Sequence, residues 1–305
     1  MKVLILGGNG FIGSHLTDRL YQRGHSIRIY DRGPNRFRQT PTGIDSFYGN
    51  YVNAEGLSDA VAGMDVVFHL ISTTVPSTSN ADPEADVTEN LLSTIRLLNI
   101  MRTSGCRRIV FLSSGGTVYG RTGGGKVSED ADTLPICSHG VVKRAVELYL
   151  HMYHELYGFE YVVLRVANPY GARQGHFGVQ GVIGTFMEKI KRQETLEIWG
   201  DGSVTRDYVY VEDVAEACEL AAGSGACGVF NIGSGVGLTL NEIIQTLSDV
   251  TGQEIVRTYL AGREYDVPAI VLNCDKAFSE LSWKSKTRFI DGITKTWDWA
   301  RSELR

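Results

Sequence analysis

The sequence has few of the features that mark secreted, metal-bound or membrane-embedded proteins. It contains five cysteines, an odd number without CxxC or Cys/His spacing, which argues against a disulfide framework or a metal site. No apolar run reaches the roughly 18 residues that span a membrane. Because the first strand starts at the N-terminus, we expect no leader segment and a cytoplasmic protein without a membrane partner.

The chain also has fewer basic than acidic residues. The chain has 30 Lys and Arg against 35 Asp and Glu, a net charge of −5, which argues against nucleic acid or an anionic membrane as the main partner. An anionic ligand would therefore need arginines that gather locally. The chain has no fixed-period repeat and no low-complexity linker, and its 305 residues fit one large domain or two medium ones.

The first 31 residues have the pattern of a strand, a glycine turn, a helix and a second strand. Residues 3–6 form a short apolar run suited to a strand buried on both faces. GxxGxxG spacing and an apolar helical pattern follow, and residues 26–30 form the second strand. The residues of the turn that we expect to line a cofactor are Gly7, Gly10, Phe11, Ile12 and Gly13.

This glycine turn predicts a phosphate cradle. Backbone N–H groups at a helix N-terminus attract a pyrophosphate, and side chains at the glycines would block its approach. Asp31 ends the second strand, where a carboxylate binds a ribose 2′-OH and repels a 2′-phosphate. We therefore expect NAD rather than NADP, although Arg32 and Arg36 stand where they could accommodate the extra phosphate.

Strands and helices alternate beyond Asp31. We expect strands at 46–48, 65–71, 108–112 and 161–166 and helices near 54–61, 83–104 and 138–156. This alternation predicts an α/β fold, a Rossmann-type doubly wound parallel sheet with ligand at the carboxyl ends of its strands. We assign 1–167 plus 207–232 to an NAD-binding domain and 168–206 plus 233–305 to a smaller C-terminal domain that binds the substrate.

Several later motifs occur in a recognisable order. They are HLIS (69–72), FLSSGGTVYG (111–120), PICSHGVVKRAVE (135–147), LRVANPYGARQ (164–174), GDGSVTRDYVYVEDVAEA (200–217), FNIGSG (230–235) and GREYDVP (262–268). With the glycine turn they resemble the extended short-chain dehydrogenase/reductase family, specifically the nucleotide-sugar 4-epimerases typified by UDP-glucose 4-epimerase. The resemblance covers essentially the whole chain. It implies an NAD-dependent isomerase that inverts C4 of a UDP-sugar by transient oxidation.

The family's chemistry uses a tyrosine base in a Tyr-x-x-x-Lys motif. Here Lys143 is present, but His139 occupies the tyrosine position. A neutral imidazole has a pKa of about 6.5 against about 10 for a phenol, and a nearby ammonium lowers it further. Three interpretations stay open: His139 is a working base, it impairs a tyrosine enzyme, or the protein binds NAD and sugar nucleotide without turnover.

A second departure concerns the hydroxyl partner of the base. The family commonly has Ser or Thr at the third position of the SSx triplet, where this chain has Gly115. Strand alternation predicts that Ser113 faces the same way as position 115, so Ser113 is the preferred substitute and Ser114 the second. Alternatively, both hydroxyls only satisfy backbone groups at a strand end.

The resemblance also implies ligand-binding positions elsewhere in the chain. For the cofactor these are Asn50, Tyr51, Leu70, Ile71, Ser72, Asn90 and Lys143, beside Asp31 and Arg32. For the sugar nucleotide they are Thr74, Asn168, Glu197, Ile198, Trp199, Arg206, Arg263, Asp266 and Ile270. Two arginines from separate loops suit a diphosphate, because each guanidinium can bind it in a bidentate manner.

Three further expectations concern the size of the sugar, the oligomeric state and an alternative reaction. Ile270 stands where hexose-restricted enzymes tend to have a bulky tyrosine, so the N-acetylhexosamine pair is a candidate beside UDP-glucose and UDP-galactose. The helices at 83–104 and 138–156 match those of a homodimeric four-helix bundle in the family. A 4,6-dehydratase would need an Asp–Glu pair after the strand, where this chain has Gly115 and Gly116.

Overall fold

The computed structural model describes residues 1–76, 78–174, 181–262 and 267–302. Its strands are β1 Lys2–Leu6, β2 Ser26–Asp31, β3 Asp45–Tyr48, β4 Val66–His69, β5 Arg108–Ser114, β6 Lys126–Val127, β7 Glu160–Val166, β8 Asn168–Tyr170, β9 Leu196–Trp199, β10 Thr205–Tyr210, β11 Gly228–Ile232, β12 Gly237–Thr239, β13 Arg257–Leu260 and β14 Ala269–Leu272.

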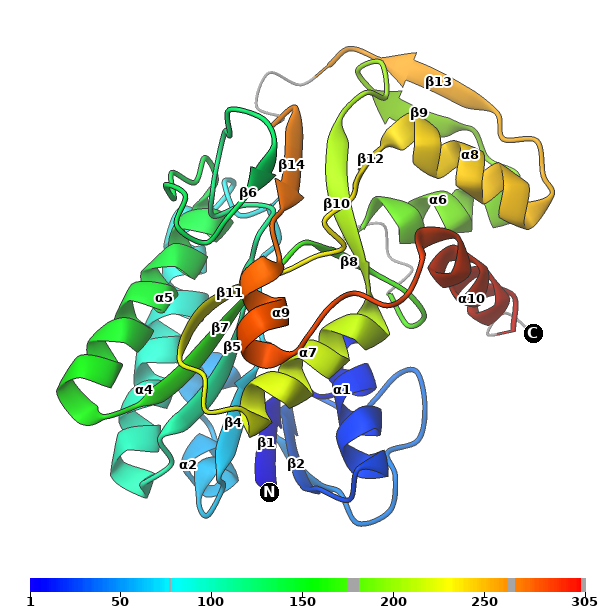
Figure 1. The fold of residues 1–305 in the computed structure, drawn as a ribbon. Coiled ribbons are helices and arrows are strands. Elements are labelled where there is room, and N and C mark those ends of the chain that lie inside the picture. Colours follow the sequence, from blue (N-terminus) through cyan, green and yellow to red (C-terminus); the bar gives the residue numbers. More distant parts are fainter. Residues whose placement is uncertain (77, 175–180, 263–266, 303–305) are drawn as a thin grey trace.

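The helices alternate with these strands along most of the chain (Figure 1). They are α1 Phe11–Gln22, a short 3-10 helix Tyr51–Asn53, α2 Leu57–Val61, α3 Pro83–Asp86, α4 Ser93–Ser104, α5 Ser138–Tyr157, α6 Val182–Lys191, α7 Val211–Gly223, α8 Leu240–Thr251, α9 Asp275–Leu281 and α10 Phe289–Ser302. None of the described helices is long and apolar enough to cross a membrane.

The large sheet has seven strands in the order β11-β7-β5-β4-β1-β2-β3, and every neighbouring pair is parallel. The chain starts in the middle with β1, builds outward through β2 and β3, and then crosses to the other side with β4. This reversal of strand order is the place where an open α/β sheet binds its ligand, at the carboxyl ends of the strands. The predicted Rossmann-type sheet is thus confirmed.

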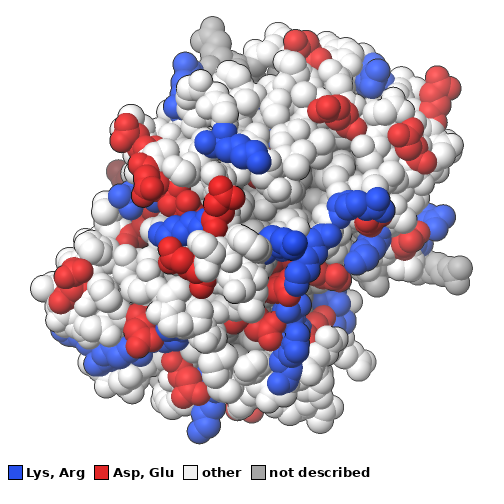
Figure 2. Space-filling view, viewed as in Figure 1, with Lys and Arg blue, Asp and Glu red and all other residues white. Residues whose placement is uncertain are grey.

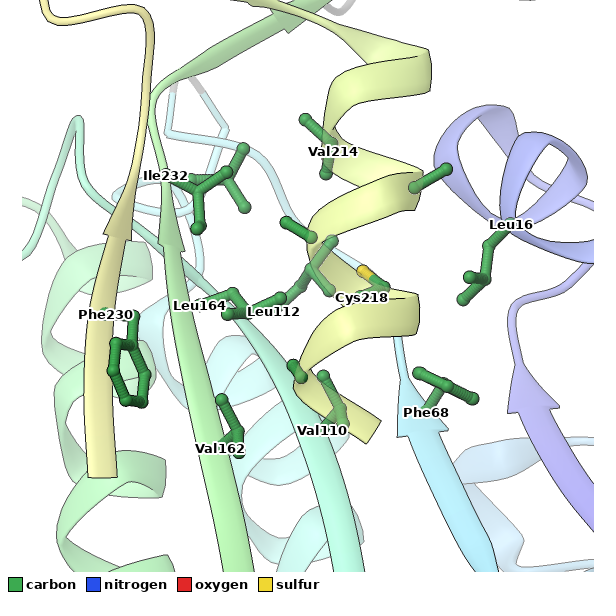
Figure 3. Packing of buried hydrophobic residues seen from close by; sticks show 14 of the residues in the cluster. Leu16, Phe68, Val110, Leu112, Val162, Leu164, Val214, Cys218, Phe230 and Ile232 are labelled. Carbon is green, nitrogen blue, oxygen red and sulfur yellow. The ribbon is translucent and has the colours of Figure 1, made fainter. Parts of the chain in front are cut away.

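Both faces of this sheet are buried, which explains the near-continuous apolar runs of its strands. Along β1, Val3 and Ile5 join one core cluster while Leu4 and Leu6 join the other, as the alternation of a strand requires. Helices α1, α7 and α9 cover the first face, and α2, α4 and α5 cover the second. Figure 3 shows Cys218 of α7 over the strands that carry Leu112 and Leu164.

A smaller assembly lies above the carboxyl edge of the large sheet in Figure 1. Strands β12, β10, β14 and β6 form a second sheet, with β8 paired to β10, and β13 pairs with β9. Helices α6, α8 and α10 pack on these strands around a third core cluster. The domain boundaries given above stay a prediction.

The predicted helix at 83–104 is interrupted. Its first turn, α3, runs into a π-helical segment, Val87–Leu92, before α4 continues to Ser104. A π-helical turn is wider than an α-helical one and often occurs at functional sites. Here it carries Asn90, whose side chain is buried with that of Asp86 at the end of α3.

Candidate functional site

The glycine turn after β1 is held open by backbone geometry. Gly7 has a φ of +83°, which favours glycine. A Cβ on Gly13 would lie 2.0 Å from the Gly7 carbonyl oxygen, so α1 packs directly on the turn only because Gly13 has no side chain. Gly10 is the N-cap of α1 and makes no side-chain capping bond, which leaves the helix N-terminus with its positive end for a ligand.

Asp31 ends β2 beside this turn. Its Oδ2 accepts a hydrogen bond of 3.0 Å from the Asn9 backbone N–H, and its Oδ1 accepts one of 2.7 Å from the Arg32 N–H. Asn9 is 7% exposed, and its Oδ1 has no hydrogen-bond partner among the described residues. A glycine cradle, an open helix end, a carboxylate at the ribose position and an unpaired buried oxygen together fit a dinucleotide.

The segment after β4 forms the other wall of the cradle. A Cβ on Gly7 would lie 3.3 Å from the Ile71 side chain and 3.5 Å from the backbone of Leu70. Both Leu70 and Ile71 are only partly buried, and the Ser72 hydroxyl donates to the Thr74 carbonyl. Leu70 and Ile71 are therefore brought to the turn, while the role of Ser72 at the cofactor stays a prediction.

Asn50 and Tyr51 lie in different surroundings: Asn50 is exposed, and Tyr51 is buried. Asn50 Oδ1 accepts a hydrogen bond of 2.9 Å from the Val52 N–H, a local cap. Tyr51 is 3% exposed, and its hydroxyl lies 2.9 Å from Nε2 of the buried His69. The side chain of Tyr51 thus points into the core, and a cofactor contact at this position stays a prediction.

The start of α5 is fixed against the end of β5. A Cβ on Gly140 would lie 2.7 Å from the Thr117 carbonyl oxygen, so glycine is required after His139 for this approach. The loop before α3 holds the helix from the other side: the His139 N–H donates to Ser79 Oγ at 3.1 Å, and the Ser138 N–H donates to Asn80 Oδ1 at 2.8 Å. These bonds satisfy two otherwise unpaired helix-end donors.

His139 is 8% exposed and lines a small cavity with Lys143, Asn90 and Asp86. Burial and the Lys143 ammonium lower the pKa of His139 to about 4, so the imidazole is neutral at physiological pH. It can accept a proton but is a weak base. Lys143, four residues after His139 in the motif, therefore shares the cavity with an uncharged imidazole.

Lys143 is held at the end of β5. Its Nζ donates to the Leu112 carbonyl at 2.9 Å and lies 4.7 Å from the centre of the Phe111 ring. Burial lowers the pKa of Lys143 to about 8, against the opposing influence of Asp86 and Glu147. The ammonium form thus persists at neutral pH in a site that water barely reaches.

Sequence reasoning missed Asp86, the charged group that completes this cavity. Asp86 is fully buried and accepts hydrogen bonds from the side chains of Thr74, Asn90 and Ser138 at 2.8, 2.9 and 2.7 Å. Thr74 and Asn90, predicted to bind ligands, are therefore engaged with this carboxylate. The spacing of Asp86 and Asn90, four residues apart on one helical face, was the available signal.

The two candidate hydroxyls lie in different surroundings. Ser113 is 5% exposed and donates to Glu147 Oε1 at 2.5 Å, so its hydroxyl belongs to a buried network, and its role as partner of the base stays a prediction. Because β5 ends at Ser114, alternation does not extend to position 115, whose Cβ would instead lie 2.5 Å from Leu272. Ser114 Oγ and Asn168 Oδ1 both lie about 4 Å from a Cβ on Gly116.

A second cavity lies within the smaller assembly. It is lined by predicted substrate positions that come from β8, β9 and β10: Asn168, Glu197, Ile198, Trp199 and Arg206. The Arg206 guanidinium donates to the Val267 carbonyl at 2.6 Å. Gln174, which was not predicted, is 7% exposed and lines the same cavity with its Oε1 unpaired among the described residues.

Three other substrate predictions have different outcomes. Arg263 and Asp266 lie outside the described residues. Ile270 of β14 is 3% exposed within the first core cluster, and it pairs in register with Arg206. Its influence on the size of the sugar stays a prediction.

Charge on the surface is mixed on the face shown in Figure 2, where basic and acidic side chains are interspersed. Individual pairs account for much of this pattern. For example, Arg173 donates to Asp18 at 2.6 Å, which removes it from the set of arginines that could serve a diphosphate. The local positive charge of the substrate cavity therefore comes from Arg206 among the described residues that line it.

Comparisons with known proteins agree with this geometry. Residues 3–233 match the NAD dependent epimerase/dehydratase family. The chain is 33% identical to a UDP-glucose 4-epimerase of Mycolicibacterium smegmatis over 99% of both chains. Its fold matches a UDP-glucose 4-epimerase of Thermotoga maritima solved with UDP-glucose, with a TM-score of 0.94, 33% identity and full coverage of both chains. The Thermus thermophilus UDP-glucose 4-epimerase with NAD gives 0.93 and 32%, again over both complete chains.

Proposed function

The chain belongs to the NAD dependent epimerase/dehydratase family, and from this premise we propose that it epimerises a UDP-sugar at C4 with His139 as the proton acceptor. The observation that carries the proposal is the buried, neutral imidazole of His139, one helical turn before Lys143. A group that takes the proton of a sugar hydroxyl must be unprotonated at the working pH. His139 meets that requirement.

The cofactor fits the cradle described above, with the glycine turn at the pyrophosphate and Asp31 at the adenosine ribose. Bound NAD supplies the acceptor and donor of the hydride at C4. The chain's own residues hold the sugar and move the proton. His139 takes it from the 4-hydroxyl and returns it, while Lys143 holds its ammonium at the end of β5.

The proposed activity is weaker than that of a tyrosine enzyme. A general base works best when its pKa lies near the operating pH. Burial and Lys143 hold the pKa of His139 near 4. Formation of the imidazolium during proton transfer is therefore unfavourable. An imidazole is also shorter than a phenol. Hydride transfer, which is coupled to loss of the 4-hydroxyl proton, is the step most affected.

The UDP group occupies the second cavity, within the smaller assembly. Trp199 is 43% exposed at its edge and offers a flat surface for the base, while Arg206 supplies a cation for the diphosphate. Asn168 lines this cavity, and its Oδ1 and the Ser114 Oγ both lie about 4 Å from a Cβ on Gly116. The sugar is glucose or galactose, or the corresponding N-acetylhexosamine pair.

A matched set of variants tests the proposal. Epimerisation of UDP-glucose, UDP-N-acetylglucosamine and UDP-glucuronic acid is measured for the parent, His139→Tyr and His139→Gln. We expect slow turnover of one sugar by the parent, faster turnover by H139Y, and a loss of at least about 100-fold in H139Q, which keeps a polar side chain but no base. Equal rates for parent and H139Q contradict His139 as the base, and inactivity of all three proteins indicates a binding protein.

We also infer a homodimer that forms through α5. Val141, Leu148, Met152 and Leu156 are exposed on this helix, at spacings that place them on one face. Val87 and Leu92 of the adjoining π-helical segment are exposed as well. Such an apolar stripe on neighbouring helices favours burial against a second copy.

Sedimentation tests the dimer. Leu148→Glu should shift the protein toward monomer, because the interface would bury the new charge. Phe278→Glu is the control, since Phe278 is a comparably exposed apolar residue on α9, far along the chain from α5. A monomeric parent, or equal effects of the two substitutions, contradicts an interface on α5.

A further inference from the structure

Exchange of tyrosine for histidine alters the charge of the proton-transfer site. A tyrosine base is an anion before it accepts a proton and is neutral afterwards, so with a lysine ammonium the pair goes from neutral to singly positive. A histidine base is neutral before and positive afterwards. With Lys143 the pair goes from singly to doubly positive, which is unfavourable in a buried site.

A carboxylate nearby would restore the original charges. Two carboxylates act on Lys143, namely Asp86 and Glu147. Glu147 is already paired with Arg165 at 2.7 Å and with Arg144 at 3.2 Å. Its charge is therefore offset within its own network.

Asp86 differs from Glu147 in its partners. The three side chains that donate to its carboxylate, from Thr74, Asn90 and Ser138, are all neutral. Asp86 is fully buried and lines the same cavity as His139 and Lys143. Among the described residues no Arg or Lys forms a salt bridge with Asp86, and the cation that shares its cavity is Lys143.

The remaining titratable group of the cavity does not compete for this role. His69 is 2% exposed, and burial together with Lys143 lowers its pKa to about 3. It is therefore neutral at physiological pH. The charges that face His139 are the ammonium of Lys143 and the carboxylate of Asp86.

We propose that Asp86 is a positioning residue that lets histidine serve in place of tyrosine, because its carboxylate offsets the charge that His139 gains with the substrate proton. The inference rests on the proposed function. Ser138, directly before His139, donates to Asp86 and so fixes the carboxylate beside the first turn of α5. The net charge of Asp86, His139 and Lys143 together goes from zero to +1 when His139 accepts the proton. The net charge of a tyrosine–lysine pair changes in the same way.

A double-mutant cycle tests the charge. Asp86→Asn keeps the shape and an acceptor oxygen, and the Ser138 hydroxyl can turn to accept from the new amide. We expect D86N to lower kcat by at least about tenfold in the parent with little change in KM, and by less than about threefold in the H139Y background. Equal losses in both backgrounds, or no loss in the parent, overturn the proposal.

Two further variants separate charge from shape. Ser138→Ala removes the hydrogen bond to Asp86 but leaves the carboxylate, so kcat should fall by less than about threefold. Asp86→Glu keeps the charge and should retain more activity than D86N. A loss in S138A as large as that in D86N contradicts a role through charge.

A readout without turnover keeps this inference independent of the reaction. The titration of His139 is followed by NMR with ring-labelled histidine in the NAD-loaded protein. Because Asp86 favours the imidazolium, D86N should move the titration of His139 to lower pH while S138A leaves it nearly unchanged. If D86N leaves the titration in place, the inference fails, whatever reaction the protein catalyses.

Discussion

The cradle after β1 and the cavity at the start of α5 lie at the same edge of the sheet but are built differently. The cradle consists of backbone, and its shape depends on glycines such as Gly13 that admit no side chain. The cavity consists of buried side chains whose charges depend on one another, above all His139, Lys143 and Asp86. We therefore expect added side-chain volume to disrupt the cradle. In the cavity, we expect the loss of a charge to reduce activity more than a change of shape does.

The largest effect should come from added volume in the cradle. Gly13→Ala places a Cβ 2.0 Å from the Gly7 carbonyl oxygen, so α1 must shift. We expect NAD affinity to fall by at least about 100-fold and the free energy of unfolding by about 3 kcal/mol. Gly223→Ala is the control, a helical glycine of α7 with no atom within 4 Å of the added Cβ. NAD titration and denaturant unfolding measure both, and normal affinity of G13A contradicts the account.

Removal of a charge from the cavity should come next. Lys143 lowers the pKa of His139, so Lys143→Met should raise that pKa from about 4 toward the ordinary value. The same change should lower kcat/KM by about 100-fold, because the site loses the ammonium at the end of β5.

Histidine NMR and steady-state kinetics measure these two effects of K143M. Lys276→Met is the control, because Lys276 also lies over an aromatic ring, that of Phe230, at 4.8 Å. An unmoved titration of His139 in K143M contradicts the coupling.

The cavity should also make the fold sensitive to acid. The pKa of His139 lies near 4 in the folded protein and near 6.5 in the unfolded chain. The unfolded state therefore binds more protons between these values, and stability falls as the pH drops through them.

Denaturant unfolding at about pH 7 and about pH 4.5 measures this loss. Replacement of His139 by Gln should make the loss smaller by about 2 to 3 kcal/mol. His69, whose pKa is lowered to about 3, contributes the same trend in both proteins. An identical pH dependence of the two proteins would show that His139 is not buried as described.

The smallest effect should come from a site remote from both regions. Thr239 caps α8 in a capping box, in which its Oγ1 accepts from the Glu242 N–H at 3.1 Å and the Glu242 carboxylate accepts from the Thr239 N–H at 2.8 Å. Thr239→Ala should lower the free energy of unfolding by about 1 kcal/mol without a change in kcat/KM. A change in turnover would mean that the cap couples to the site.

The sequence predicted the backbone-built region well. The glycine spacing and the apolar runs of residues 3–6 and 26–30 report local geometry, and the structure has β1, the turn, α1 and β2 in that order. The positions of His139 and Lys143 followed from a motif within one helix. Such features depend on residues that are close together in the chain, so they can be predicted from short stretches of the sequence.

The side-chain-built region was harder to predict, because its contacts join distant residues. Asp86 meets Ser138 across 52 positions, and no local pattern reports that contact. The sequence did not predict the bond of Ser113 to Glu147, because β5 ends at Ser114 and alternation does not reach position 115. Nor did it predict that the ring of Tyr51 turns inward to His69.

The pH dependence of kcat/KM, measured for the parent and H139Y with the preferred UDP-sugar, tests the central claim most directly. His139 must be neutral and Lys143 protonated, so the parent should lose activity below about pH 4 and above about pH 8, in line with the pKa values of these two groups. The kcat/KM of H139Y should start to fall at a higher pH than that of the parent as the solution is acidified. An acid limb at the same pH in both proteins would contradict the account, because the proton acceptor would then be a group other than residue 139.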